Sequence, residues 1–91
     1  MPVPAKILLV EDNPSDRLFM DACIRDGGGD VELHHAARLA DASSSLKQQH
    51  FELVIADLNL PDGEGLETFF KVKALAADSA IVVMTGMDDT D

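Results

Sequence analysis

Basic residues are scarce in this sequence, which has 7 Lys and Arg against 17 Asp and Glu in 91 residues. The formal net charge is therefore −10 with the histidines neutral. A surface with this charge repels polyanions, which argues against nonspecific binding to nucleic acids and to anionic membranes. The charge is compatible with bound cations and with basic partners. We therefore predict no nucleic-acid partner and no membrane partner.

Cysteine and long apolar segments are also scarce. The only cysteine, Cys23, cannot form an internal disulfide, and this fits a reducing compartment and predicts a cytoplasmic location. The start of the chain is followed by only four consecutive apolar residues, which do not make a signal peptide. No apolar run is long enough to cross a bilayer. The length allows at most one small domain.

What the sequence does contain is a regular alternation of predicted strands and helices. Continuous apolar runs predict three strands: residues 7–10, which would be buried on both faces, residues 53–56, which would be buried, and residues 80–84, which are apolar throughout. Residues 31–35 alternate between apolar and polar, which predicts a strand at a sheet edge. Apolar residues at helical spacing predict three helices: residues 14–26, 38–49 and 65–76. Asn13 is the expected N-cap of the first helix, and Gly27-Gly28-Gly29 is expected to end it.

The apolar positions of each helix predict the face that packs inward. In the first helix these are Leu18, Phe19, Ala22 and Cys23, with Cys23 as a small core residue. In the second helix they are Leu39, Ala42 and Leu46. In the third helix they are Leu66, Phe69, Val72 and Ala76, with Phe70 beside them.

This alternation predicts an α/β fold of the flavodoxin-like class, with helices on both faces of a parallel sheet and three layers in all. If the alternating strand lies at the edge, the strand order is 2-1-3-4. In such sheets, ligands bind beyond the carboxyl ends of the strands at the point where the order reverses. Here that point lies between the first and third strands.

Polar side chains follow the strands at this edge. Glu11 and Asp12 follow the first strand, Asp57 ends the third, and Thr85 follows the fourth. Neighbouring carboxylates raise one another's pKa, and a divalent cation relieves their repulsion. Oxygen ligands without Cys or His suit Mg²⁺ or Mn²⁺, and Mg²⁺ commonly completes its shell with phosphate oxygens. Asp57 could then act as a nucleophile toward phosphorus and form an aspartyl phosphate, which the Thr85 hydroxyl and the Gly86 N–H would contact.

These residues resemble the motifs of receiver domains in bacterial two-component response regulators. The matching features are Glu11-Asp12 after the first strand, Asp57 in Asp-Leu-Asn-Leu-Pro-Asp-Gly, and Thr85-Gly86 after the fourth strand. The match runs in register over about residues 6–89. The resemblance implies a phosphorelay protein whose Asp57 accepts a phosphoryl group from a histidine kinase or a histidine phosphotransfer protein.

The resemblance also implies roles for the neighbouring residues. Glu11, Asp12, Asp57 and the backbone carbonyl of Asn59 would hold Mg²⁺, and Thr85 would be the switch hydroxyl that turns toward the phosphoryl group. Asn59 and Met87 match positions that tune dephosphorylation in the family. Such a phosphoprotein signals by a conformational change. It catalyses its own phosphorylation and hydrolysis only weakly, so we do not expect an enzyme.

The chain departs from the family pattern at its end. Receiver domains continue with a further helix, strand and helix, and a Lys before that strand pairs with the phosphoryl group. Lys71 and Lys73 lie in the third predicted helix and do not match that Lys. We therefore expect residues 1–91 to be an incomplete receiver domain that lacks the last helix-strand-helix. Its fourth strand would be an open edge that self-associates or is completed by another segment.

Two other functions are compatible with the sequence. A pseudo-receiver, used as an assembly module, would keep the acids without switching by phosphorylation. The lack of the Lys would favour it if this chain is the mature form. A metal-dependent phosphatase on a related fold would use Asp57 as its nucleophile. Such enzymes commonly carry an acid–base Asp at the position of Asn59, and an amide cannot transfer the proton. We prefer the receiver.

Overall fold

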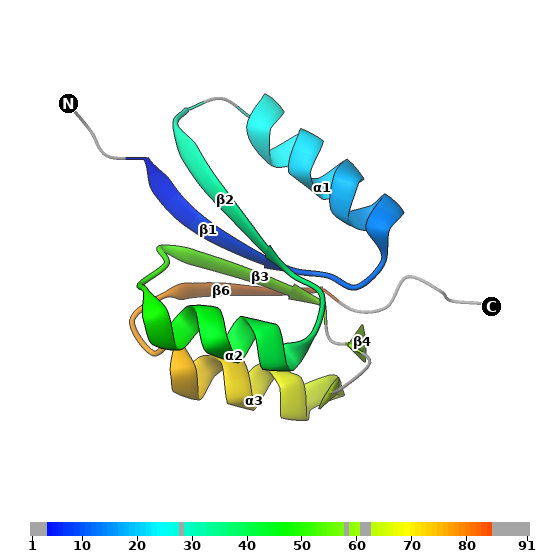
Figure 1. The fold of residues 1–91 in the computed structure, drawn as a ribbon, viewed down its shortest axis with the longest axis vertical. Helices are drawn as coiled ribbons and strands as arrows, with labels where there is room; N and C mark the ends of the chain where they lie inside the picture. Colours follow the sequence, from blue (N-terminus) through cyan, green and yellow to red (C-terminus); the bar gives the residue numbers. More distant parts are fainter. Residues whose placement is uncertain (1–3, 28, 58, 61–62, 85–91) are drawn as a thin grey trace.

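A parallel sheet with helices on both faces forms the body of the protein in the computed structural model, which describes residues 4–27, 29–57, 59–60 and 63–84. The strands of the main sheet are β1 (Ala5–Val10), β2 (Val31–Ala36), β3 (Leu53–Asp57) and β6 (Ala80–Met84). The helices are α1 (Pro14–Asp26), α2 (Leu39–Gln48) and α3 (Gly65–Leu75). Figure 1 shows α1 on one face of the sheet, with α2 and α3 on the other. The predicted three layers are confirmed.

The strand order is β2-β1-β3-β6, with every neighbouring pair parallel. This is the predicted order 2-1-3-4 along the chain. The alternating strand β2 lies at one edge, and β6 lies at the other. The register pairs Val10 of β1 with Ala56 of β3, so the residues that follow these two positions emerge side by side. The order reverses between these two central strands.

Alternate residues of the central strands fill two separate apolar cores. Leu8, Val10, Val54 and Ala56 face α2 and α3 and join the larger core, in which Phe51 is fully buried. Ile7, Leu9 and Ile55 face the opposite side and form a smaller core beneath α1. The inward face of α2 is as predicted, because Leu39 and Ala42 are buried and Leu46 packs partly buried against the larger core.

The predicted inward face of α1 is wrong. Leu18 and Phe19 are 70% and 69% exposed, and Ala22 and Cys23 are exposed as well. The helix packs instead through Met20 and Ile24, which lie partly buried against the smaller core. Asp21 lies on the same side, 3.1 Å from Nε2 of His35 on β2.

The reason is that α1 has two apolar stripes that could pack against the sheet, one with Leu18 and Phe19 and one with Met20 and Ile24. Tertiary contacts determine which of the two is buried. The more hydrophobic stripe contains the four predicted residues, but the contacts with β2 and with the smaller core select the other one. Cys23 is consequently an exposed thiol rather than a core residue.

The ends of α1 are as predicted. Asn13 caps its first turn, and Gly27 follows its last residue.

The predicted inward face of α3 is partly wrong. Val72 and Ala76 are buried, as predicted, but Leu66 and Phe70 are 67% and 62% exposed. At about 100° per residue, position 66 lies roughly 120° around the helix from Val72, whereas position 68 lies only about 40° away. Thr68 therefore takes the inward position, where it is fully buried despite its hydroxyl.

A short antiparallel hairpin between β3 and α3 was not predicted. It consists of β4 (Asn59–Leu60) and β5 (Gly63–Glu64), with Asn59 paired to Glu64 and Leu60 to Gly63. Leu60 is buried in the larger core. Gly65, the first residue of α3, has φ of +48°, which favours a residue without a Cβ at this bend. The hairpin thereby carries the chain from the end of β3 to the start of α3.

Among the described residues, no strand pairs with the outer side of β6, and two of its side chains are exposed. Val82 and Val83 are 49% and 39% exposed, although the sequence is apolar throughout this strand. Among the helices that the structure describes, none is long and apolar enough to span a bilayer.

Candidate functional site

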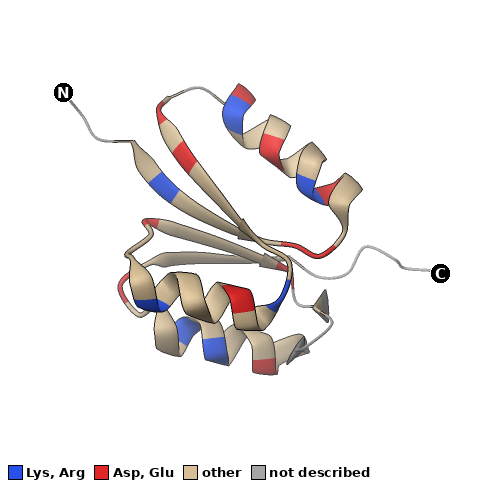
Figure 2. Cartoon of the chain, viewed as in Figure 1, with Lys and Arg blue, Asp and Glu red and all other residues tan. Residues whose placement is uncertain are grey.

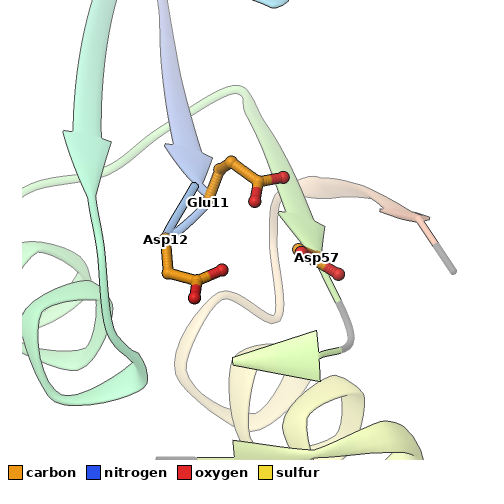
Figure 3. A group of neighbouring side chains, drawn as sticks. All are labelled: Glu11, Asp12 and Asp57. Carbon is orange, nitrogen blue, oxygen red and sulfur yellow. The ribbon is translucent and has the colours of Figure 1, made fainter. Parts of the chain in front are cut away.

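Three carboxylates meet where β1 and β3 end. Glu11 and Asp12 directly follow β1, and Asp57 is the last residue of β3. Figure 3 shows the side chains of Glu11 and Asp12 on the β1 side and that of Asp57 on the β3 side of one small space. One oxygen from each residue lies within 4.8 Å of the other two. The predicted convergence of these three acids is confirmed.

The local sequence explains why the acids are held here. The backbone N–H of Glu11 donates to the carbonyl of Ala36 at 2.9 Å, so the hydrogen bonding between β1 and β2 continues one residue beyond β1. The chain then turns into α1 at Asn13. The Asn13 side chain accepts hydrogen bonds from the N–H groups of Ser15 and Asp16 at 2.9 and 3.1 Å. This N-cap fixes the turn that presents Asp12 beside Glu11.

Glu11 is the buried member of the three, with 4% of its surface exposed, whereas Asp12 is exposed and Asp57 is half-buried. Burial raises the pKa of Glu11 from 4.5 to about 7, since the charged form loses hydration. The Asn13 N–H, 3.2 Å from Oε2, acts in the opposite direction. The charge and hydrogen bonding of Asp57, and the charge of Asp16, raise the pKa further.

This donor set fits a hard divalent cation. The three groups supply oxygen ligands from two adjacent strands, with no Cys or His among them. Mg²⁺ and Mn²⁺ prefer such ligands, and Mg²⁺ takes one or two carboxylates while it keeps water and phosphate oxygens in its shell. Near pH 7 the raised pKa leaves Glu11 partly protonated when no cation is bound. A bound cation would displace that proton. Figure 2 shows this region as acidic, with red segments in the loop after β1 and at the end of β3.

Other predicted site residues lie near or beyond the edge of the described structure. Asn59 begins β4, two residues after Asp57, and its carbonyl as a metal ligand stays a prediction. Thr85, Gly86 and Met87 lie outside the described residues, and so do their predicted roles. Lys71 and Lys73 lie on α3, as expected, and Lys71 is 3.8 Å from Glu67 of the same helix.

Sequence reasoning missed the difference between Glu11 and Asp12. Their adjacency suggested an equivalent pair, but only Glu11 is buried and has a raised pKa. It also missed the hydrogen bond from the Asn13 N–H, since Asn13 was predicted only as a helix cap. Adjacent residues at a strand end point in opposite directions, and that alternation was the available signal.

Comparisons with known proteins identify the family of this chain. A family model described as the response regulator receiver domain matches residues 7–91. The transcriptional regulatory protein ZraR of Salmonella typhimurium is 28% identical over 85 residues, which cover 93% of this chain and 19% of that protein. This chain therefore spans about a fifth of the length of that relative.

Solved structures show the same fold. The MaeR response regulator bound to beryllium trifluoride superposes with a TM-score of 0.82 at 22% identity, over 93% of this chain and 70% of that one. The Vibrio cholerae chemotaxis protein CheY4 superposes with a TM-score of 0.78 at 26% identity, over 98% of this chain and 72% of that one.

Proposed function

This chain belongs to the response regulator receiver family of two-component systems, and we propose that it accepts a phosphoryl group on Asp57 with the help of bound Mg²⁺. The observation that carries the proposal is the meeting of Asp57 with Glu11 and Asp12 within 4.8 Å. This meeting occurs beyond the carboxyl ends of β1 and β3, where the strand order reverses. A nucleophilic carboxylate and the acids that would hold its cation therefore share one site.

In the proposed reaction, one oxygen of Asp57 attacks the phosphorus of a phosphohistidine on the donor protein. The new O–P bond gives the aspartyl phosphate, and the bond from phosphorus to the imidazole nitrogen breaks. The electron pair stays on the imidazole, which then takes up a proton. Bound Mg²⁺ would offset the negative charge of the phosphoryl oxygens.

The residues of the site have different proposed roles. Asp57 is half-buried at the strand end, so a donor can reach it, while buried Glu11 and exposed Asp12 offer oxygens from the neighbouring strand. Glu11, Asp12 and Asp57, with the carbonyl of Asn59, are the proposed ligands of Mg²⁺, and Mn²⁺ suits the same oxygens. Thr85 and Gly86 are proposed to contact the phosphoryl group. Asn59 and Met87 are proposed to tune the rate at which the aspartyl phosphate is hydrolysed.

The proposed partner is a histidine kinase or a histidine phosphotransfer protein, and the proposed location is the cytoplasm. The proposed output is a conformational change, because the phosphorylated side chain carries about −1.5 to −2 units of charge in place of the −1 of the carboxylate, beside Glu11 and Asp12. We propose that the chain is a phosphoacceptor and not an enzyme that turns over a substrate. We also expect the edge of β6 to associate with a second copy or with another segment.

The test is chemical phosphorylation in the presence of Mg²⁺. The chain is incubated with acetyl phosphate, and its mass is measured before and after treatment with hydroxylamine, which cleaves acyl phosphates. We expect a gain of one phosphoryl group that hydroxylamine removes and that the Asp57→Asn variant does not show. The Asp78→Asn variant is the matched control, because Asp78 is an exposed acid at the other end of the sheet. It should be modified like the unaltered chain.

The outcomes separate the three functions. No mass gain, in a chain that is folded by circular dichroism, would contradict the proposal and favour a pseudo-receiver that serves in assembly. Continuous release of phosphate from phosphate esters would indicate the phosphatase. Loss of modification in Asp12→Asn at limiting Mg²⁺, with recovery at high Mg²⁺, would support the cation site.

A further inference from the structure

A polar contact between Asp21 and His35 joins α1 to the sheet. Oδ2 of Asp21 lies 3.1 Å from Nε2 of His35, and the two side chains are 21% and 33% exposed. Figure 1 shows α1 running back alongside β2 from the end of β1. Among the residues that the structure describes, no other ion pair or side-chain hydrogen bond connects α1 to a strand. The contact is therefore the one polar link between this helix and the described strands.

Arg25 orients the carboxylate of Asp21 for this contact. Nε of Arg25 donates to Oδ1, the other oxygen of Asp21, one turn along the same helix. This hydrogen bond is the main cause that holds the pKa of Asp21 below its usual value, so the group is ionised at neutral pH. An ionised carboxylate only accepts hydrogen bonds, so Nε2 of His35 carries the proton that the two residues share.

The contact closes a ring of chain that contains the turn with the acids. At one end of the ring, the N–H of Glu11 donates to the carbonyl of Ala36 at 2.9 Å. At the other end, Asp21 contacts His35, which directly precedes Ala36 on β2. The segment from Glu11 to Asp21 is thus attached at both ends to consecutive residues of one strand.

The apolar contacts of α1 do not fix its tilt by themselves. Met20 and Ile24 lie partly buried against the smaller core, and apolar burial has no preferred direction. The contact of Asp21 with His35 is directional, and it lies about 12 Å along the helix from Asn13 at 1.5 Å per residue. A tilt of ~5° about this point would move the first turn of the helix by about 1 Å.

Asp12 is the acid whose position depends on this tilt. Glu11 is buried and is held by the hydrogen bonding between β1 and β2. Asp12 is exposed and directly precedes Asn13, the N-cap of α1. Mg²⁺ requires near-octahedral oxygens at about 2.0–2.1 Å, so a displacement of ~1 Å at one ligand would weaken its binding.

We propose that Asp21 and His35 are positioning residues for the cation site and that they act through Asp12. This proposal rests on the proposed function, because it requires that Glu11, Asp12 and Asp57 hold Mg²⁺. With α1 fixed to β2, the carboxylate of Asp12 stays close to those of the other two acids. Without the contact, α1 rocks on its apolar contacts and Asp12 spends less time within reach of the cation. The affinity for Mg²⁺ then falls, although the sheet and its cores are unchanged.

The dissociation constant of Mg²⁺ measures this effect. It is obtained from backbone amide shifts in an NMR titration at pH 8, where Glu11 is charged. His35→Leu should weaken binding about 3–10-fold, less than the ~10–100-fold cost of losing a direct partner of a metal ligand. His35→Gln keeps an N–H donor and should stay within about 2-fold of the unaltered chain. His34→Leu is the matched control and should also leave the constant unchanged, because His34 is likewise 33% exposed but contacts Phe51 of the larger core.

A double-mutant cycle separates positioning from a general loss of stability. In an Asp12→Asn background, His35→Leu should change the Mg²⁺ dissociation constant by less than about 1.5-fold, because the charged ligand that it positions is gone. An effect of full size in that background would show that His35 acts on the whole fold and would overturn the proposal. An unchanged constant in His35→Leu, or an equal loss in His34→Leu, would overturn it as well.

Hydrogen exchange in EDTA gives a readout without the cation. His35→Leu should speed the exchange of α1 amides and leave those of β1 and β3 protected. Asp21→Ala should do the same, and it replaces His35→Leu in every comparison if circular dichroism shows that variant to be unfolded. Unchanged exchange of α1 would contradict the proposal.

The positioning role and the proposed function can fail separately. A chain that shows these effects of His35→Leu on Mg²⁺ but is not modified by acetyl phosphate would contradict phosphoryl acceptance alone. A chain that is modified, and whose His35→Leu variant is modified equally at every Mg²⁺ concentration, would contradict the positioning role alone. No binding of Mg²⁺ to the unaltered chain would overturn both.

Discussion

Replacing Glu11 by Gln should stabilise the metal-free chain at neutral and alkaline pH. Glu11 is 4% exposed, and burial is the main cause that raises its pKa from 4.5 to about 7. The charged carboxylate is therefore disfavoured in the folded state. Gln has nearly the same shape and can still accept the hydrogen bond from the Asn13 N–H through its amide oxygen. The substitution removes the charge and keeps the packing.

The size of the effect follows from the pKa difference between the folded and unfolded states. A rise of about 2.5 units corresponds to about 3 kcal/mol at 1.36 kcal/mol per unit, which is the largest gain expected. The neutral amide oxygen of Gln accepts the Asn13 N–H less strongly than a carboxylate does, which offsets part of this gain. We therefore expect the free energy of unfolding to increase by about 1–3 kcal/mol at pH 8.

The sign of the pH dependence can be worked out directly. Below pH 4.5 Glu11 is protonated in both states and contributes no difference. Between 4.5 and about 7 the folded state keeps a proton that the unfolded state has released, so the stability of the unaltered chain falls as pH rises. Above about 7 the loss is complete. The advantage of the Glu11→Gln variant should therefore be small near pH 5 and large near pH 8.

Urea unfolding of both proteins at these two pH values, with EDTA and then with Mg²⁺, measures the effect. The difference between the two proteins cancels the contributions of the three histidines and the other acids. Glu67→Gln is the matched control, because Glu67 is an exposed acid of α3, and it should change stability by less than ~0.5 kcal/mol. Mg²⁺ should stabilise the unaltered chain more than the variant. A destabilised Glu11→Gln variant at pH 8, or an advantage that does not change with pH, would refute the reasoning.

Five further variants, in three separate tests, probe the packing that holds the site in place, each by the midpoint of urea unfolding. Thr68→Val should raise stability by about 1 kcal/mol, because the fully buried Thr68 hydroxyl has no hydrogen-bond partner among the described residues, and a lower midpoint would show that a partner exists. Phe51→Ala should cost about 3–5 kcal/mol, since Phe51 is fully buried, whereas Phe70→Ala should cost little because Phe70 is 62% exposed; similar losses would contradict the assigned core. Asn13→Ala should cost about 1 kcal/mol through the lost N-cap of α1, and Asn13→Ser should restore most of it; no rescue by Ser would contradict the cap.

The arrangement of the sheet could be predicted because the burial of a strand, on one face or on both, can be read from the alternation of its own residues. A strand is buried on one face or on two, and the alternation of residues 31–35 was enough to place β2 at an edge and to order the strands. The helix faces could not be predicted with the same success. The sequence of α1 offers two stripes that can pack, and the stripe with Met20 and Ile24 is chosen by contacts with β1, β2 and β3 that no local pattern contains.

The same distinction separates what was predictable in the site from what was not. Asp57 could be placed beside Glu11 and Asp12, because parallel strands end at one edge and the order reverses between β1 and β3. The inequality of Glu11 and Asp12 depends on one hydrogen bond, from the Glu11 N–H to the carbonyl of Ala36, which extends the strand ladder by a residue. With this bond Glu11 continues the strand and is buried, whereas Asp12, the next residue, is exposed. Because a buried acid is costly to charge and an exposed one is not, the two should contribute differently to a cation. Glu11 would couple cation binding to stability and pH, and Asp12 would mainly supply a ligand.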